Sequence, residues 1–82
     1  MEKKYHTITI TIYDRNFAFN KVGELLHEYA EDIHLRVGYP VPDKNTSVIF
    51  IIVTLTNNEL GALSGKLGQI DSVKVKSTTL KF

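Results

Sequence analysis

Residues Ser47–Leu55, SVIFIIVTL, form the stretch that decides the fold of this chain. The run is rich in β-branched residues and too short to span a membrane, and this pattern predicts a β-strand. Its side chains divide into two sets, one on each face: Ile49, Ile51, Val53 and Leu55, and opposite them Val48, Phe50 and Ile52. A strand in an antiparallel sheet usually turns one polar face to water. Because both faces are apolar here, we expect an interior strand that needs cover on both sides.

The residues before this stretch predict a strand, a helix and a second strand. Tyr5–Tyr13 alternates isoleucine with threonine, which is typical of a strand with one aliphatic face and one threonine face. Asp14 offers an N-cap oxygen to a helix that we expect to reach about Tyr29. The apolar side chains at helical spacing are Ala18, Val22, Leu25, Leu26 and Tyr29. Ile33–Tyr39 alternates again, and the two prolines that follow cannot donate ladder hydrogen bonds, so we expect the sheet to end there.

The residues after the stretch predict a second helix and a last strand. Thr56 to Glu59 has the pattern of a capping box, which indicates the start of a helix. The core stripe of this helix is Leu60, Leu63, Leu67 and Ile70. Asp71 and Ser72 predict a turn before a strand at Val73–Leu80. The resulting order is βαββαβ within one domain, residues 1–82.

This order favours a ferredoxin-like α+β fold. Right-handed βαβ crossovers place the first and third strands in the middle of a four-stranded antiparallel sheet, with both helices on one face. The other face is then open, and we expect the second side-chain set of Ser47–Leu55 to lie on it. The cationic or imidazole side chains expected to flank this set are His34 and Arg36 on one edge strand, and Lys74 and Lys76 on the other. A shift of one residue in register would reverse the faces.

Composition narrows the possible functions. The chain has 82 residues and a formal net charge of +1, so its overall charge gives no drive toward nucleic acid or anionic lipid. It contains no cysteine, which excludes disulfides, thiol catalysis and cysteine-based zinc sites. The N-terminal residues MEKKYHT lack the apolar core of a signal peptide. We therefore expect a cytoplasmic protein without membrane association.

The open face is the strongest functional signal in the sequence. We expect an oligomer interface formed by five residues, namely Thr9, Thr11, Val48, Phe50 and Ile52. An apolar centre with polar flanks is the usual anatomy of an interface core and its rim. Two copies could stack face to face, or add edge to edge with partial stacking. The alternative is a merely exposed patch, although monomers seldom expose a large contiguous one.

Glycines in the second helix form another unusual feature. Gly61, Gly65 and Gly68 fall on one strip with Ser64 beside them. Each glycine costs about 1 kcal/mol relative to alanine inside a helix, so the strip needs a reason. We expect close packing against Gly23 of the first helix, and the alternative is that the strip admits a ligand or a partner chain near the backbone.

Metal, catalytic and RNA-binding functions find little support. His6, His27 and His34 lack the spacing of a preformed metal site, and we interpret them as solvated or rim residues without a metal or cofactor. Neither a nucleophile–base pair nor a phosphate loop can be assembled from local spacing, so we expect no enzyme activity and no catalytic residues. Sheets of this topology bind RNA through exposed aromatic rings on both central strands, but the first strand offers threonines, so RNA binding is a less favoured function than the two binding roles below.

Three segments carry a resemblance to a known family: Leu35–Pro40 (LRVGYP), Gly61–Ile70 (GALSGKLGQI) and Val73–Lys76 (VKVK). With them the chain resembles the small stand-alone proteins named iron-only hydrogenase system regulators. These are similar in fold to ACT/RAM domains and to the C-terminal domain of the nickel-responsive repressor. Tyr13-Asp14-Arg15 is similar to the start of the ACT turn, but Asn16-Phe17 stands where that group has Pro-Gly.

The resemblance implies an ACT-like regulatory module, and the open face predicts that this module acts as a homo-oligomer. A small effector is expected at the subunit interface, near Arg36 and the glycine strip with its Ser64 (Gly61, Ser64, Gly65 and Gly68). The nickel repressor's cysteine and His-x-His ligands are missing here, so no metal site carries over. The first strand begins close to Met1, which leaves no ribbon-helix-helix segment and implies no direct DNA binding. A regulatory protein partner is expected, and the alternative function is a protein interaction module without a small ligand.

Overall fold

The structure of the protein is a computed structural model that describes residues 2–82. Four strands, two α-helices and one 3₁₀ turn follow each other along the chain. Their bounds are β1 Lys4–Ile12, α1 Arg15–His27, the 3₁₀ turn Ala30–Asp32, β2 Ile33–Val41, β3 Thr46–Leu55, α2 Asn57–Gly68 and β4 Val73–Thr79. The expected βαββαβ order is confirmed, and the ends of each element fall within two residues or so of the expected ones.

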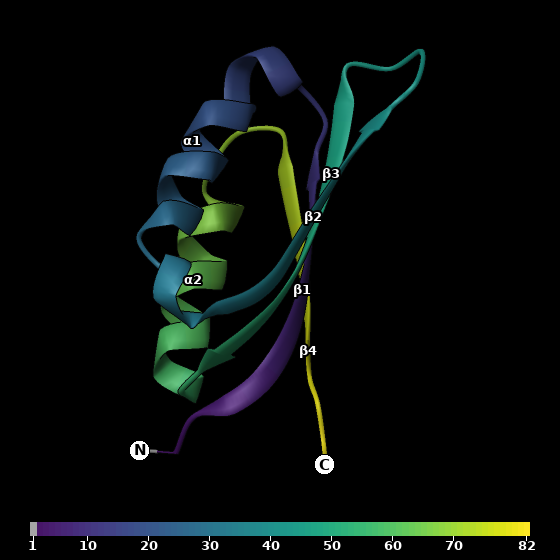
Figure 1. Ribbon diagram of the computed structural model, residues 1–82. Helices are drawn as coiled ribbons and strands as arrows, with labels where there is room; N and C mark the ends of the chain where they lie inside the picture. Colours follow the sequence, from purple (N-terminus) through teal and green to yellow (C-terminus); the bar gives the residue numbers. More distant parts are fainter. Residues whose placement is uncertain (1) are drawn as a thin grey trace.

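The four strands form one antiparallel sheet in the order β2-β3-β1-β4. Both helices lie on the same face of this sheet, and no element in the described part of the chain covers the opposite face (Figure 1). This arrangement is the ferredoxin-like α+β fold that the sequence predicts. The strand Ser47–Leu55 is an interior strand, as expected, because β3 lies between β2 and β1.

The core lies between the sheet and the helices. The even-numbered residues of β1 face it together with the odd-numbered residues of β3, as the pairing of Ile10 with Ile49 and of Ile8 with Ile51 shows. From the helices, Ala18, Val22, Leu26, Leu63 and Leu67 are completely buried. Leu25, Tyr29, Leu60 and Ile70 pack against this core from its margin. The apolar stripes of both helices are therefore those that the spacing predicts.

Both helices begin at the expected caps. The Asp14 carboxylate accepts a hydrogen bond from the Phe17 backbone N–H at 3.3 Å. In α2, the Thr56 hydroxyl accepts from the Glu59 N–H at 3.1 Å and the Glu59 carboxylate accepts from the Thr56 N–H at 2.8 Å, which completes the capping box. The second of these bonds is the main reason why the pKa of Glu59 is lowered.

The edge strand β2 departs from the expected register. A β-bulge lies between Ile33, which pairs with Val53, and Leu35, which pairs with Ile52. After the bulge, Leu35, Val37 and Tyr39 share a face with Ile52, Phe50 and Val48, the face away from the helices. An extra residue in one strand reverses the facing of all residues beyond it. The expected position of Arg36 on the open face is therefore wrong, because this residue pairs with Ile51 on the helix side.

Two smaller expectations are also corrected. Pro40 does not end the sheet but lies inside β2 and pairs with Ser47 of β3. An edge strand tolerates proline because its outer side forms no ladder hydrogen bonds. His6 is not a solvated residue but is completely buried on the helix side of β1. Its Nε2 donates to the Leu55 carbonyl oxygen at 3.0 Å, and its Nδ1 lies 2.9 Å from the Thr79 hydroxyl. Backbone and hydroxyl partners thus satisfy a polar ring inside the core.

Candidate functional site: the open face of the sheet

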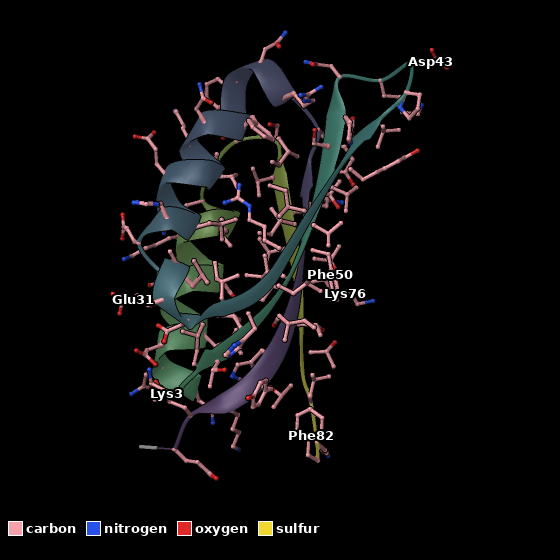
Figure 2. All side chains as sticks on the ribbon, in the orientation of Figure 1. Lys3, Glu31, Asp43, Phe50, Lys76 and Phe82 are labelled. Carbon is pink, nitrogen blue, oxygen red and sulfur yellow. The ribbon has the colours of Figure 1, made fainter. Side chains whose placement is uncertain are left out.

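The open face divides lengthwise into two halves with different chemistry. The apolar half, on β2 and β3, consists of Leu35, Val37, Tyr39, Val48, Phe50 and Ile52. The polar half, on β1 and β4, consists of Thr7, Thr9, Thr11, Lys74 and Lys76. Figure 2 shows one residue of each half, Phe50 and Lys76, on the side of the sheet away from the helices. Local alternation places these side chains, because successive residues of a strand point to opposite faces.

The apolar half is exposed to solvent in a single chain. The side chains on the edge strand are the most exposed, with 44% for Leu35, 49% for Val37 and 57% for Tyr39. The three residues of β3 beside them are half-buried by their neighbours. Soluble monomers seldom leave a contiguous group of large apolar side chains open to water unless it serves binding. The apolar half is therefore a candidate contact surface.

The electrostatics of the face are one-sided. None of the four strands contains Asp or Glu, so the lysines of β4 face no carboxylate on the sheet. The ammonium group of Lys74 lies 6.0 Å from the centroid of the Tyr13 ring, which can accept a cation. The expected flanking positions of Lys74 and Lys76 are confirmed. The cationic charge is confined to one edge, away from the apolar half.

An aromatic cluster of Tyr5, His34 and Phe82 lies at one end of the open face. The Tyr5 and His34 rings stack with their centroids 5.3 Å apart, and Phe82 meets Tyr5 edge-on at 5.5 Å. His34 Nε2 is also hydrogen-bonded to the Thr54 hydroxyl, across the bulge from β2 to β3. His34 therefore lies on the open face as expected, and it is exposed.

The expected effector residues do not meet within one chain. Arg36 lies beside α1, where a Cβ on Gly23 would be 4.0 Å from its Nη2 atom. The glycine strip lies on α2, which packs most closely on β4 at the opposite edge of the sheet. Gly61, Gly65 and Gly68 are exposed, and a Cβ at any of them would meet no atom within 4 Å apart from the backbone of its own helix and its chain neighbours. The expected close packing of the helices through these glycines is therefore wrong.

Other polar groups give no sign of a reactive centre. The Ser64 hydroxyl next to the strip is buried and has no hydrogen-bond partner among residues 2–82. Within the same residues, no group of three or more His, Asp or Glu side chains is arranged to hold a metal ion. No helix in the described part of the chain is long and apolar enough to cross a membrane.

Half of the apolar residues on the open face were not predicted as part of the candidate interface. Thr9, Thr11, Val48, Phe50 and Ile52 lie there as expected, but Leu35, Val37 and Tyr39 were not anticipated. Their alternation is visible in the sequence, yet it fits either face equally well. Only the bulge beside His34 decides which face they take.

Comparisons with known proteins agree with this fold. A family model described as "TM1266-like: Iron-only hydrogenase system regulator, putative" matches residues 4–77. Among solved structures, the uncharacterized protein TM1266 from Thermotoga maritima is 51% identical, with a TM-score of 0.93, and the match covers 98% of this chain and 100% of that one. The crystal structure of the ACT domain from GTP pyrophosphokinase of Chlorobium tepidum is 19% identical, with a TM-score of 0.76, over 93% of this chain and 99% of that one. A comparison with curated proteins finds no match.

These matches differ in what they establish. The ACT domain has low identity and shows the fold alone, which is ACT-like. The family model spans most of the chain, and the Thermotoga protein matches nearly all of it. This chain therefore belongs to the TM1266-like family of iron-only hydrogenase system regulators.

Proposed function

We propose that the protein is a small regulatory module, without enzyme activity, that acts as a homo-oligomer assembled through its open face. The observation that carries this proposal is the apolar half, six neighbouring apolar side chains on a sheet face that no element within residues 2–82 covers. Removal of such side chains from water is the main favourable term in most protein associations. The family description supports a regulatory role.

A second copy of the chain is the occupant that fits this surface best. A twofold interface brings the same patch of both subunits together, so the patch must complement itself. The apolar half does so, since it carries no charge that needs an opposite partner. If the twofold axis lies over β2 and β3, Lys74 and Lys76 remain in solvent at the rim. A twofold axis over the centre of the sheet would instead bury the polar half, with its lysines, against the apolar half of the partner.

The regulatory part of the proposal concerns a small effector. Arg36 and the glycine strip with its Ser64 both lie on the helix side of the sheet, near its opposite edges. In this proposal they come together at a second subunit boundary, where the β2 edge of one subunit meets the β4 edge of another. A protein partner in the cytoplasm would receive the signal. The family's printed description names iron-only hydrogenase, and this system is the proposed target of the regulation.

The assembly is tested by measuring molar mass in solution. We expect size-exclusion chromatography with light scattering to give a dimer or higher oligomer for the wild type. Phe50→Asp would give a monomer, because it places a carboxylate in the middle of the apolar half. Lys76→Asp is the matched control, since it changes charge on the same face but outside the proposed contact. A monomeric wild type at high concentration would refute self-association and would favour an interaction module that binds a different protein.

A thermal-shift screen tests the effector separately. A ligand that binds the native state raises the melting temperature, whatever its chemical class. Metals, amino acids and nucleotides are the first panel, and each hit is repeated on Arg36→Gln. A ligand that raises the melting temperature of Arg36→Gln as much as that of the wild type would contradict the proposed site. If no compound raises the melting temperature of a stable oligomer, the result would favour a module without a small ligand.

A further inference from the structure

A cleft lies at the end of the sheet where residues 2–5 at the start of β1 run beside residues 79–82 at the end of β4. Its volume is about 390 Å³, and Figure 2 shows Lys3 and Phe82 at this end of the molecule. We propose that the cleft binds a nucleotide, with the base on its aromatic rings and the phosphate group at its lysines. One chain supplies the whole cleft, and its lining includes neither the apolar half nor Arg36 and the glycine strip, so the assignment stands apart from the proposed function.

Contacts within the chain hold the two walls of the cleft side by side. The Leu80 N–H donates to the Tyr5 carbonyl oxygen at 2.9 Å, which continues the pairing of β1 with β4 beyond Thr79. The Lys3 ammonium donates to the Asp32 carboxylate at 3.3 Å and so ties the start of the chain to the 3₁₀ turn. Small-molecule sites are usually preformed, with volumes of roughly 300–1,000 Å³. The cleft therefore has a size and a framework suited to a small ligand.

The cleft offers two aromatic rings, those of Tyr5 and Phe82. The Tyr5 ring is supported by its stack with His34 and remains 43% exposed. The Phe82 ring touches Tyr5 edge-on and is 97% exposed, so it adds almost nothing to the buried core. Bases stack on such rings because every base has a π face. The two rings thus provide a platform for one flat aromatic group.

The charges of the cleft select an anion. Three lysines line it, Lys3, Lys4 and Lys81, together with one acidic residue, Glu2. Lys3 is paired with Asp32, whereas Lys4 and Lys81 form no ion pair within residues 2–82. An ammonium group is a compact point charge that suits a phosphate group, while planar recognition of a carboxylate typically uses arginine. A phosphate group attached to a flat ring therefore matches both kinds of side chain in the cleft.

The surroundings of the cleft favour a single nucleotide over a longer strand. A single-stranded nucleic acid needs further rings and cations along its path. The next residues of β1 on the open face are Thr7 and Thr9, which offer no ring to a second base. The aromatic platform is therefore confined to the end of the sheet.

The probe for this assignment is adenosine monophosphate. We expect it to shift the amide NMR signals of Leu80 and Lys81 in a saturable way. Adenosine lacks the phosphate group and inorganic phosphate lacks the ring, so each should bind about tenfold more weakly or worse. Phe82→Ala should weaken binding of the nucleotide by about tenfold, as expected for loss of a stacked base. Lys81→Gln should weaken binding of the nucleotide but leave binding of adenosine unchanged.

Matched controls come from α1. Phe17 is also an exposed phenylalanine, and the Lys21 ammonium lies 4.4 Å from the centroid of its ring, but neither residue lines the cleft. Phe17→Ala and Lys21→Gln should therefore bind the nucleotide like the wild type. Urea denaturation of all four variants separates loss of binding from loss of folding. Equal affinity for the nucleotide and for inorganic phosphate, unchanged binding in Phe82→Ala, or the absence of a saturable shift would each overturn the assignment.

Two other patterns of NMR shifts would also overturn it. Shifts at Arg36 and Gly65 in place of Leu80 and Lys81 would assign the nucleotide to the proposed effector site, which a melting temperature alone does not distinguish. Tighter binding of oligoadenylate, with shifts that extend to Thr9 and Lys76, would indicate a surface for single-stranded RNA.

Discussion

Replacing Val37 with alanine is a sensitive test of the proposed contact through the apolar half. Val37 lies at the middle of β2, pairs with Phe50 and is 49% exposed in one chain. The substitution removes two methyl groups, each contributing about 0.8 kcal/mol when it is fully buried. About half of their surface is still available to a partner, so each subunit loses about 0.8 kcal/mol of association free energy. A twofold interface contains the position twice, which gives a loss of about 1.6 kcal/mol per dimer.

This loss corresponds to a dissociation constant about fifteenfold weaker than that of the wild type. Analytical ultracentrifugation over a dilution series measures both constants directly. Thr78→Ala is the matched control on the same sheet face, because Thr78 lies on β4, the edge strand farthest from β2. Urea denaturation at low protein concentration checks that the Val37→Ala monomer keeps its stability, as expected for a half-exposed edge-strand residue. Unchanged association in Val37→Ala, beside a dimeric wild type, would refute the placement of the contact over β2 and β3.

Three further predictions concern stability and use urea denaturation. Gly65→Ala should stabilise the protein by about 1 kcal/mol, because it removes the glycine penalty from a helix position where a Cβ meets nothing; a destabilised variant would contradict the open environment of the strip. His6→Leu should cost about 1–3 kcal/mol, because the hydrogen bonds of the buried ring are lost; wild-type stability would show that these bonds contribute nothing. The pKa of Glu59 is lowered from its ordinary value of 4.5, chiefly by the Thr56 N–H. A carboxyl whose pKa is lower in the folded state stabilises the fold above its unfolded-state pKa, and this contribution disappears as the pH falls through the folded-state pKa. Stability should therefore decrease below about pH 4.5, and Glu59→Gln should decrease less over this range; identical pH profiles would exclude the capping box as a cause.

The sequence determined the elements and most of the core, because these depend on short-range patterns. Alternation of isoleucine and threonine in β1 needs only its neighbours to define two faces. The caps at Asp14 and Thr56 act within three residues of the helix starts, and both formed as predicted. The order of the elements then fixed the topology, since right-handed crossovers allow few arrangements of a βαββαβ chain.

The facing of β2 was decided only in the tertiary structure. The same alternating residues can turn either way, and the β-bulge after Ile33 turns Leu35, Val37 and Tyr39 outward while Arg36 turns toward α1. No local pattern marks such a bulge, because it arises from pairing with β3. The candidate contact surface therefore includes Leu35, Val37 and Tyr39, which the sequence did not predict there, and it does not include Arg36, which the sequence did.

The packing environment of single residues could likewise not be predicted from the sequence. Gly65 on α2 and Gly38 on β2 look alike in the sequence, but one lies on an open helix surface and the other lines a small cleft beside α1. His6 is polar, yet the Leu55 carbonyl and the Thr79 hydroxyl, both distant in sequence, allow its burial. Local patterning therefore determined what this chain folds into, and long-range pairing decided which side chains remain free to bind. The physical reason is that backbone periodicity is set by neighbouring residues, whereas register and burial depend on partners far along the chain.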